Sequence, residues 1–172
     1  IGCTLVKDRD AQFKAFTLQP DYLKYDENSP EWLSDYGVEL SRDFKALKAW
    51  MSLKTHGAEK YGRLIQQNVD QAKYLSELVK ESDKLELVAP VPLNIVCFRY
   101  VSESLSDDKL AALNDKLVYE LMYAGFFAAT TKVKGVTCLR VANTNHRTTF
   151  EDFREYISKV LELGQKLEKE FK

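Results

Sequence analysis

The sequence has few residues that interrupt secondary structure or form cross-links, with 7 glycines, 4 prolines and 3 cysteines in 172 residues. Scarce glycine and proline argue against long disordered or fibrous stretches. The cysteines (Cys3, Cys97 and Cys138) are odd in number and far apart, which argues against a disulfide framework or a zinc site. This cysteine usage is typical of a reducing, cytoplasmic environment.

An excess of charge of one sign is also lacking. Lys and Arg together number 25 and Asp and Glu 26, so the formal net charge is −1. Without a basic excess, a surface that neutralises phosphates is not expected, which argues against nucleic-acid binding. No stretch approaches the roughly 18 apolar residues of a membrane-spanning helix, so no membrane association is expected.

The common catalytic motifs are absent too. The sequence contains no glycine-rich phosphate loop and no G-x-S-x-G motif, and its two histidines are far apart. We interpret His56, which precedes Gly57, as a cation at the end of a helix, and His146 as part of a polar turn. Clustered metal ligands are not evident, so no metal site is predicted.

The first distinctive feature of the sequence is an aromatic segment in which apolar residues follow no regular period. Residues 3–7 predict a short strand, and Asp8–Phe16 one or two helical turns. Residues 17–40 contain several aromatic residues, Tyr22 among them, interrupted by proline and glycine. Unstructured stretches of this length are uncommon in compact domains unless they are functional or disordered. We therefore expect this aromatic segment to pack against another surface.

Regular periodicity begins after this segment. Phe44, Leu47, Trp50 and Met51 share one helical face, and Ser41 is well placed as the N-cap of that helix. A second, longer amphipathic helix is predicted from residue 61 to residue 79.

Residues 85–172 predict the order strand, strand, helix, strand, strand, helix. The strands are expected at 85–88, 93–101, 126–133 and 136–141, with a turn at Lys134-Gly135. Ser106 opens one helix, and a capping box of Thr148 and Glu151 opens the last. This order is typical of an α+β domain with helices on one face of a mainly antiparallel sheet.

Several separated motifs point to one family. Tyr22-Leu23-Lys24 lies in a long loop and precedes the run Leu40–Trp50, and further on come Val96–Arg99 and Leu139–Val141 with Asn143, Asn145 and Thr148. In this order the motifs closely resemble group II pyridoxal-phosphate-dependent decarboxylases, nearest to the aromatic-L-amino-acid decarboxylase branch. The resemblance covers nearly the whole chain.

The resemblance implies an α/β fold of the type I pyridoxal-phosphate-dependent transferases, of which this chain is the C-terminal portion. Residues 1–40 would then be the end of the cofactor-binding large domain with a mobile catalytic loop at about 17–40, residues 41–84 connecting helices, and residues 85–172 the small α+β domain. The lysine that binds pyridoxal 5′-phosphate would precede Ile1, as would most of the cofactor site. We therefore expect no cofactor-binding residue in this chain, and no turnover by this chain alone.

The same resemblance assigns two site residues. Tyr22 is implied to protonate the substrate carbon that has lost its carboxylate, from a loop that closes over the active site of the partner subunit in a homodimer. Ser41 replaces a glycine near the substrate ring and is implied to bind substrate. Read without the resemblance, Tyr22 is an aromatic residue that pins a loop, and Ser41 is the helix cap. Asp43 replaces an arginine of the pattern, and no role is carried over to it.

The implied activity is decarboxylation of an aromatic or related L-amino acid to an amine and CO2. The tyrosine at position 22 favours this over aldehyde formation, since family members with phenylalanine there form aldehydes. A glutamate, cysteine sulfinate or diaminobutyrate decarboxylase of the same family is an alternative. So is a non-catalytic dimerisation module. The expected partners are the missing N-terminal portion of the same protein, a second copy and a small-molecule amino acid.

Overall fold

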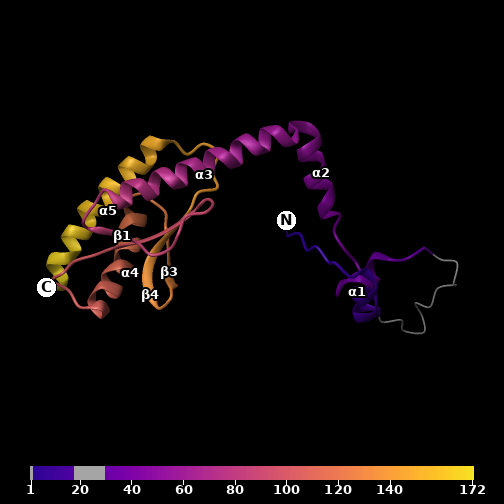
Figure 1. The fold of residues 1–172 in the computed structure, drawn as a ribbon, viewed down its shortest axis with the longest axis horizontal. Helices are drawn as coiled ribbons and strands as arrows, with labels where there is room; N and C mark the ends of the chain where they lie inside the picture. The colour runs from indigo at the N-terminus through magenta and orange to yellow at the C-terminus, as the bar shows by residue number, and fades with distance from the viewer. Residues whose placement is uncertain (1, 18–29) are drawn as a thin grey trace. The chain divides into compact units, whose positions relative to one another are not determined.

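A computed structural model describes residues 2–17 and 30–172 of the chain (Figure 1). These residues divide into two compact units, Ile1–Gly57 and Ala58–Lys172. The three-part division at residues 40 and 84 stays a prediction. Within the described residues, no helix is long and apolar enough to cross a membrane.

The first unit contains two helices and a short 3-10 turn. They are α1 (Arg9–Phe16), η2 (Leu33–Tyr36) and α2 (Lys45–His56). Asp8 caps α1, its side chain accepting from the backbone N–H of Ala11 at 2.9 Å. The Phe13 ring packs on that of Tyr36 with centroids 5.6 Å apart, which joins α1 to η2.

The predicted strand at residues 3–7 is wrong. Residues 2–6 have no regular secondary structure, and they pair with no strand of the described chain. Alternating apolar residues form a stable strand only when a neighbouring strand accepts and donates their backbone hydrogen bonds. Helix α1, in contrast, confirms the helical turns predicted for residues 8–16.

The second unit is an α+β domain whose sheet is antiparallel throughout, with strand order β1-β2-β4-β3. Helices α4 and α5 both contact one face of this sheet, and α3 packs beside α5 (Figure 1). The order predicted from the sequence is confirmed. The elements are α3 (Ala58–Lys80), β1 (Leu85–Leu87), β2 (Ile95–Tyr100), α4 (Asp107–Tyr123), β3 (Ala129–Val133), β4 (Val136–Ala142) and α5 (Phe150–Phe171).

The core lies between the sheet and these helices. Phe98, Tyr100 and Leu139 are fully buried on the helix-covered face. The Phe98 ring meets that of Tyr156 from α5 edge to face, with centroids 6.2 Å apart.

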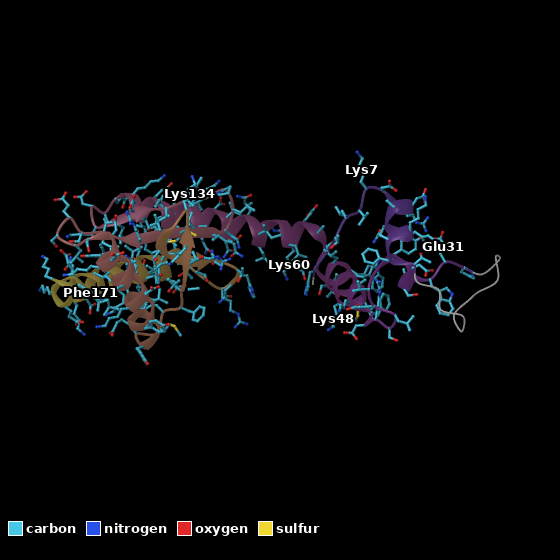
Figure 2. The ribbon with its side chains drawn as sticks, turned by 90° about the horizontal axis from the view of Figure 1, so that it is seen from below. Lys7, Glu31, Lys48, Lys60, Lys134 and Phe171 are labelled. Atoms are coloured by element: carbon cyan, nitrogen blue, oxygen red, sulfur yellow. The ribbon has the colours of Figure 1, made fainter. Side chains whose placement is uncertain are left out.

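The predicted turn between β3 and β4 is confirmed (Lys134 is labelled in Figure 2), because Lys134 and Gly135 both have positive φ, 50° and 85°. Two positive φ values match the right-handed twist of a two-residue hairpin.

The capping box of α5 lies one residue later than predicted. Thr149, not Thr148, is the N-cap, and its hydroxyl accepts from the backbone N–H of Asp152 at 3.3 Å. The Asp152 carboxylate accepts from the backbone N–H of Thr149 at 2.7 Å in return. The shorter Asp152 side chain therefore replaces Glu151 as the reciprocal acceptor.

Candidate functional site

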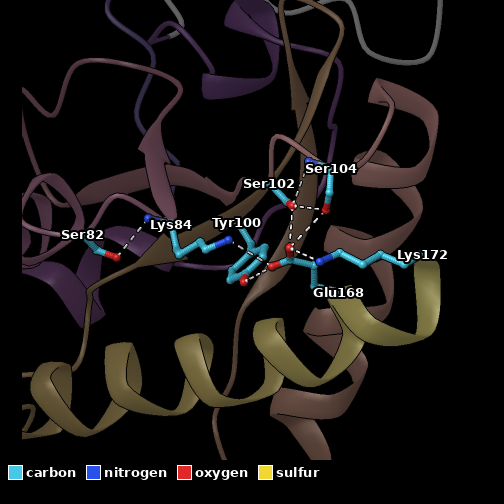
Figure 3. A network of polar contacts seen from close by, with 7 residues as sticks. All are labelled: Ser82, Lys84, Tyr100, Ser102, Ser104, Glu168 and Lys172. Atoms are coloured by element: carbon cyan, nitrogen blue, oxygen red, sulfur yellow. Dashed lines mark hydrogen bonds and ion pairs between the residues drawn. The ribbon is translucent and has the colours of Figure 1, made fainter.

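The most connected polar cluster of the second unit is centred on Glu168 of α5 (Figure 3). Its carboxylate, 10% exposed, accepts from the hydroxyls of Tyr100 and Ser102, each at 2.7 Å. The amino groups of Lys84 and Lys172 lie 3.2 and 3.3 Å from its oxygens. These contacts favour the ionised carboxylate, with the Ser102 and Tyr100 hydroxyls first, and hold the pKa of Glu168 well below its usual range.

Tyr100 shows the converse effect. Burial, and then the neighbouring Glu168 carboxylate, raise the pKa of the Tyr100 phenol far above its usual value. The pair therefore keeps a proton on the phenol and a charge on the carboxylate at any ordinary pH. Neither group is poised to exchange a proton near neutrality, so the cluster fastens α5 to β2 and is not a catalytic dyad.

A pocket of about 530 Å³ opens beside this cluster, with Arg99, Lys84, Ser102, Ser104 and Lys172 in its lining. The basic and hydroxyl groups suggest an anion site at first sight. Each is already engaged, however, because Arg99 pairs with Glu86 at 2.6 Å and the other four contact Glu168. The carboxylate of Glu168 thus already occupies the place of an anionic ligand.

A different kind of site lies on the opposite face of the sheet. Cys97 of β2 is the register partner of Arg140 of β4, so both point away from the face that carries Phe98 and Leu139. Arg140 is half-buried, and its guanidinium has no hydrogen-bond or ion-pair partner among residues 2–17 and 30–172. A partly desolvated guanidinium without a partner favours binding of a carboxylate or phosphate.

Two cysteines lie near Arg140 in the sheet: Cys97 is its register partner on β2, and Cys138 precedes it by two residues on β4. Cys97 and Cys138 are both buried free cysteines. Burial raises the pKa of the Cys138 thiol to about 11, with a smaller contribution from Cys97. The Cys138 thiol is therefore protonated at neutral pH and supplies no negative charge to Arg140.

The polar motif after β4 is structural in this fold. Asn143, 5% exposed, donates to the Gln71 side-chain oxygen at 2.8 Å and to the Asn68 carbonyl at 3.2 Å. Gln71 in turn donates to the Thr148 carbonyl. Asn145 accepts from the backbone N–H of Arg147 at 3.0 Å, which confirms the predicted polar turn around His146. These amides tie β4, α3 and the start of α5 together.

The two predicted site residues have different outcomes. Tyr22 lies outside the described residues, as does the part of the loop at 17–40 that spans residues 18–29. Ser41 is described and exposed. Its predicted capping role is wrong, because α2 begins at Lys45 with Phe44 in the N-cap position and no side-chain cap bond. The backbone N–H of Lys45 bonds to the Asp43 carbonyl, so the chain turns just before the helix and leaves Ser41 four residues ahead of it.

The histidine and metal predictions concern residues that the structure does describe. His56 occupies the last turn of α2, and Gly57 follows with φ 76°, as predicted for a helix end. No group of three or more His, Cys, Asp or Glu side chains within the described ranges lies together as a metal site would require.

Comparison with known proteins identifies the family. Residues 1–101 match the pyridoxal-dependent decarboxylase conserved domain. An aromatic-L-amino-acid decarboxylase of Bacillus atrophaeus is 33% identical over 172 aligned residues, covering 97% of this chain and 36% of the relative. A phenylacetaldehyde synthase of Petunia hybrida is 30% identical over 151 residues, covering 81% of this chain and 30% of the relative.

A solved structure is also similar. The crystal structure of Oryza sativa TDC with PLP and tryptamine superposes with a TM-score of 0.78 and 26% identity, over 90% of this chain and 33% of that chain. The fold is that of the type I pyridoxal-phosphate-dependent enzymes. The chain belongs to the pyridoxal-dependent decarboxylase family, whose cofactor is pyridoxal phosphate. It spans about a third of the length of these relatives.

The polar pocket described above does not fit this cofactor. Pyridoxal phosphate requires a lysine amino group free to react and unpaired donors for its phosphate. The lysines in this pocket, Lys84 and Lys172, are both engaged by Glu168, and its serines donate to the same carboxylate. This pocket is therefore not the cofactor site of the family.

Proposed function

We propose that this chain is the C-terminal portion of a pyridoxal-phosphate-dependent decarboxylase that converts an aromatic or related L-amino acid to its amine and CO2. The observation that carries the proposal is the guanidinium of Arg140, which is half-buried and has no partner in the part of the chain that the structure describes. Membership of the family and the 33% identity to an aromatic-L-amino-acid decarboxylase support it.

Arg140 has a specific role in this proposal. Every α-amino acid carries a carboxylate, and a guanidinium binds a carboxylate through two parallel hydrogen bonds in a fixed orientation. A strand in the middle of a sheet is a rigid support for such a contact, since β2 and β3 flank β4 on both sides. Arg140 would thus hold the substrate's α-carboxylate until the bond to Cα breaks.

For Tyr22 and Ser41 we propose the roles that the family implies. A phenol keeps its proton at neutral pH and can deliver it to Cα after the carboxylate has left. Tyr22 is proposed as this proton donor, acting from a loop that closes over the active site of the partner subunit and excludes water. Ser41 is proposed to contact the substrate's side chain, and its exposure and its distance from the first turn of α2 leave the hydroxyl available.

The assembly follows from the same proposal. The cofactor and the lysine that binds it would come from the N-terminal portion of a family chain, and the active enzyme would be a homodimer in the cytoplasm. The domains would divide at about residues 40 and 84, with residues 1–40 ending the large domain. Two buried free thiols and one exposed thiol are in keeping with a reducing compartment.

A second candidate function is oxidative aldehyde formation. It is favoured by the 30% identity to the Petunia phenylacetaldehyde synthase. The two reactions differ in the fate of Cα. It is protonated in one, and in the other it is oxidised by dioxygen, which is reduced to hydrogen peroxide while the amino group leaves as ammonia. We favour the amine product because a phenol at position 22 can supply the proton.

Product analysis tests the proposal. The protein that contains this chain together with the family's cofactor-binding portion is incubated with a panel of L-amino acids, and amine, aldehyde, ammonia and peroxide are quantified. The proposal expects amine and CO2 in equal amounts from an aromatic substrate, and a Tyr22→Phe variant that loses amine and gains aldehyde, ammonia and peroxide. Aldehyde as the main product of the unaltered protein, or turnover of acidic substrates alone, would contradict it.

A further inference from the structure

One face of helix α1 holds a later part of the chain around η2. Arg9, Gln12 and Phe13 are three and four residues apart, so their side chains share this face. The Arg9 guanidinium pairs with the Glu31 carboxylate (Glu31 is labelled in Figure 2). The Gln12 side-chain amide donates to the Tyr36 carbonyl at 2.8 Å. Side chains of α1 therefore grip both the residues before η2 and its last residue.

Tyr36 joins these contacts into one group. Its hydroxyl donates to the Glu31 carboxylate at 2.6 Å, and its ring packs on that of Phe13. The Arg9 guanidinium lies 5.2 Å from the centre of the same ring. Each charge of the ion pair thus makes a second contact to Tyr36, which distinguishes the group from an isolated surface ion pair. We call the group the α1 clamp, and it consists of Arg9, Gln12, Phe13, Glu31 and Tyr36.

The α1 clamp fixes both ends of the stretch of sequence that contains Tyr22. Helix α1 ends at Phe16, and Thr17 bonds back to the Phe13 carbonyl through its N–H at 2.9 Å and its hydroxyl at 2.6 Å. In sequence, Tyr22 lies five residues after Thr17 and nine before Glu31. At no more than about 3.6 Å per residue, the covalent reach to Tyr22 is at most about 18 Å from the first fixed end and about 32 Å from the second.

We propose that the α1 clamp positions Tyr22 for proton delivery, an inference that rests on the role proposed for Tyr22 above. A stretch of chain held at one end has more accessible arrangements than one whose two ends are held together. With fewer arrangements, a catalytic group lies within reach of its target for a larger fraction of the time. The clamp residues touch neither substrate nor cofactor in this proposal, so they are positioning residues.

The ratio of products reports the position of the phenol. When the phenol is in place, Cα receives its proton and the amine forms. When it is displaced, dioxygen oxidises Cα and is reduced to hydrogen peroxide, water supplies the aldehyde oxygen, and the amino group leaves as ammonia. A loss of folded enzyme lowers both products equally and leaves their ratio unchanged. A purely structural role for the clamp therefore does not alter the ratio of aldehyde to amine.

The first test measures this ratio in the protein that joins this chain to the family's cofactor-binding portion, with an aromatic L-amino acid in air-saturated buffer. Arg9→Ala and Glu31→Ala should each raise the ratio of aldehyde to amine by about fivefold, the effect of losing about one hydrogen bond. KM for the amino acid should not change, because the clamp does not bind substrate. Lys14→Ala is the matched control, since Lys14 is an exposed cation of α1 without a side-chain partner in the described part of the chain.

Two further measurements test whether the clamp acts as one unit. The double variant Arg9→Ala/Glu31→Ala should change the ratio no more than the larger single change, because both substitutions break the same ion pair. Amide hydrogen exchange in the 172-residue chain tests the clamp without any activity. The Asp35 N–H bonds to the Trp32 carbonyl at 3.1 Å. It should exchange about fivefold faster in Arg9→Ala and at the original rate in Lys14→Ala.

The outcomes separate this proposal from the proposed function. An unaltered protein that makes no amine would overturn the proposed function and the role of Tyr22 with it. Amine production with an unchanged product ratio in Arg9→Ala and Glu31→Ala would overturn the clamp alone. An equal rise of the ratio in Lys14→Ala, additive effects in the double variant, or Asp35 exchange that Arg9→Ala leaves unchanged would do the same. The expected result is a rise confined to the clamp variants, with KM unaltered.

Discussion

Gly164 of α5 lies directly against the ring of Tyr100 in β2. A methyl group on Gly164 would overlap the Cδ2, Cε2 and Cγ atoms of that ring. Tyr100 is fully buried, and one helical turn beyond Gly164 its hydroxyl donates to Glu168 at 2.7 Å. The ring thus fills the space that Gly164 leaves by lacking a side chain, and the Glu168 carboxylate holds its hydroxyl.

The first prediction follows from this contact. Gly164→Ala should lower the free energy of unfolding by about 1–3 kcal/mol, because the ring cannot move away in a filled core. Gly62→Ala is the matched control, since Gly62 is an exposed residue of α3 with nothing near its Cβ position. There the substitution should stabilise by up to about 1 kcal/mol through helix propensity alone. Urea unfolding of both variants measures the contrast, and equal effects would contradict the packing.

Glu168 makes stability depend on acidity. Its contacts lower the pKa of Glu168 in the folded state below the ordinary value of 4.5. The stabilisation is therefore complete at neutral pH, and it is lost as the pH falls from about 4.5 toward the lower pKa of the folded state. Glu168→Gln should cost about 1.5–3 kcal/mol at pH 7, since it removes the charge from several hydrogen bonds. Urea unfolding at pH 7 and pH 3 should show a smaller difference between variant and parent at pH 3. A difference independent of pH would contradict this role.

Two buried tyrosines make a contrasting pair. The hydroxyl of Tyr156 is buried without a partner among the described residues, and burial raises the pKa of Tyr156 well above its usual value. Tyr156→Phe removes an unsatisfied group and should leave stability unchanged or raise it by up to about 1 kcal/mol. Tyr100→Phe removes a bond to a carboxylate and should cost about 1.5–3 kcal/mol. Thermal unfolding ranks the two, and the reverse order would be inconsistent with the structure.

The start of α5 offers a test between neighbouring threonines. Thr149→Ala should destabilise by about 1 kcal/mol, because it removes the N-cap acceptor and half of the capping box. Thr148→Ala should have a smaller effect, since the bond of Thr148 to Gln71 uses its backbone carbonyl. If calorimetry showed Thr148→Ala to be the more costly change, the box predicted from the sequence would be the correct one.

The sequence was sufficient for most of the second unit because its patterns are local. Two-residue alternation located β1, and short apolar runs located β2 and β4. The spacing of Leu110, Leu113, Leu117 and Leu121 located α4. The strand β3 begins at Ala129, three residues later than predicted, because Phe126-Phe127-Ala128 continue the apolar run without pairing. A hydrophobic pattern in the sequence shows which residues are apolar, but it does not show which of them form backbone hydrogen bonds to a neighbouring strand.

The predictions were wrong where a contact in the folded chain decides which of several neighbouring residues begins a helix. Ser41 and Thr148 both had the right chemistry for a cap, but helix ends are fixed by backbone turns that residue type does not specify. The partnering of Arg140 depends on what lies across the sheet, which no local pattern contains. The one available signal was a charged residue inside the apolar run Val136–Ala142, and that signal does not separate a paired arginine from an unpaired one.

The central claim is that Arg140 binds the carboxylate of an amino-acid substrate. The most direct measurement compares Arg140→Gln with Arg99→Gln, a half-buried arginine of β2 already paired with Glu86, in the protein that joins this chain to the family's cofactor-binding portion. For Arg140→Gln we predict that KM for the amino acid rises by about 100-fold while affinity for the product amine, which lacks the carboxylate, is unchanged. Equal KM values in the two variants, or an equal loss of affinity for amino acid and amine, would contradict the account.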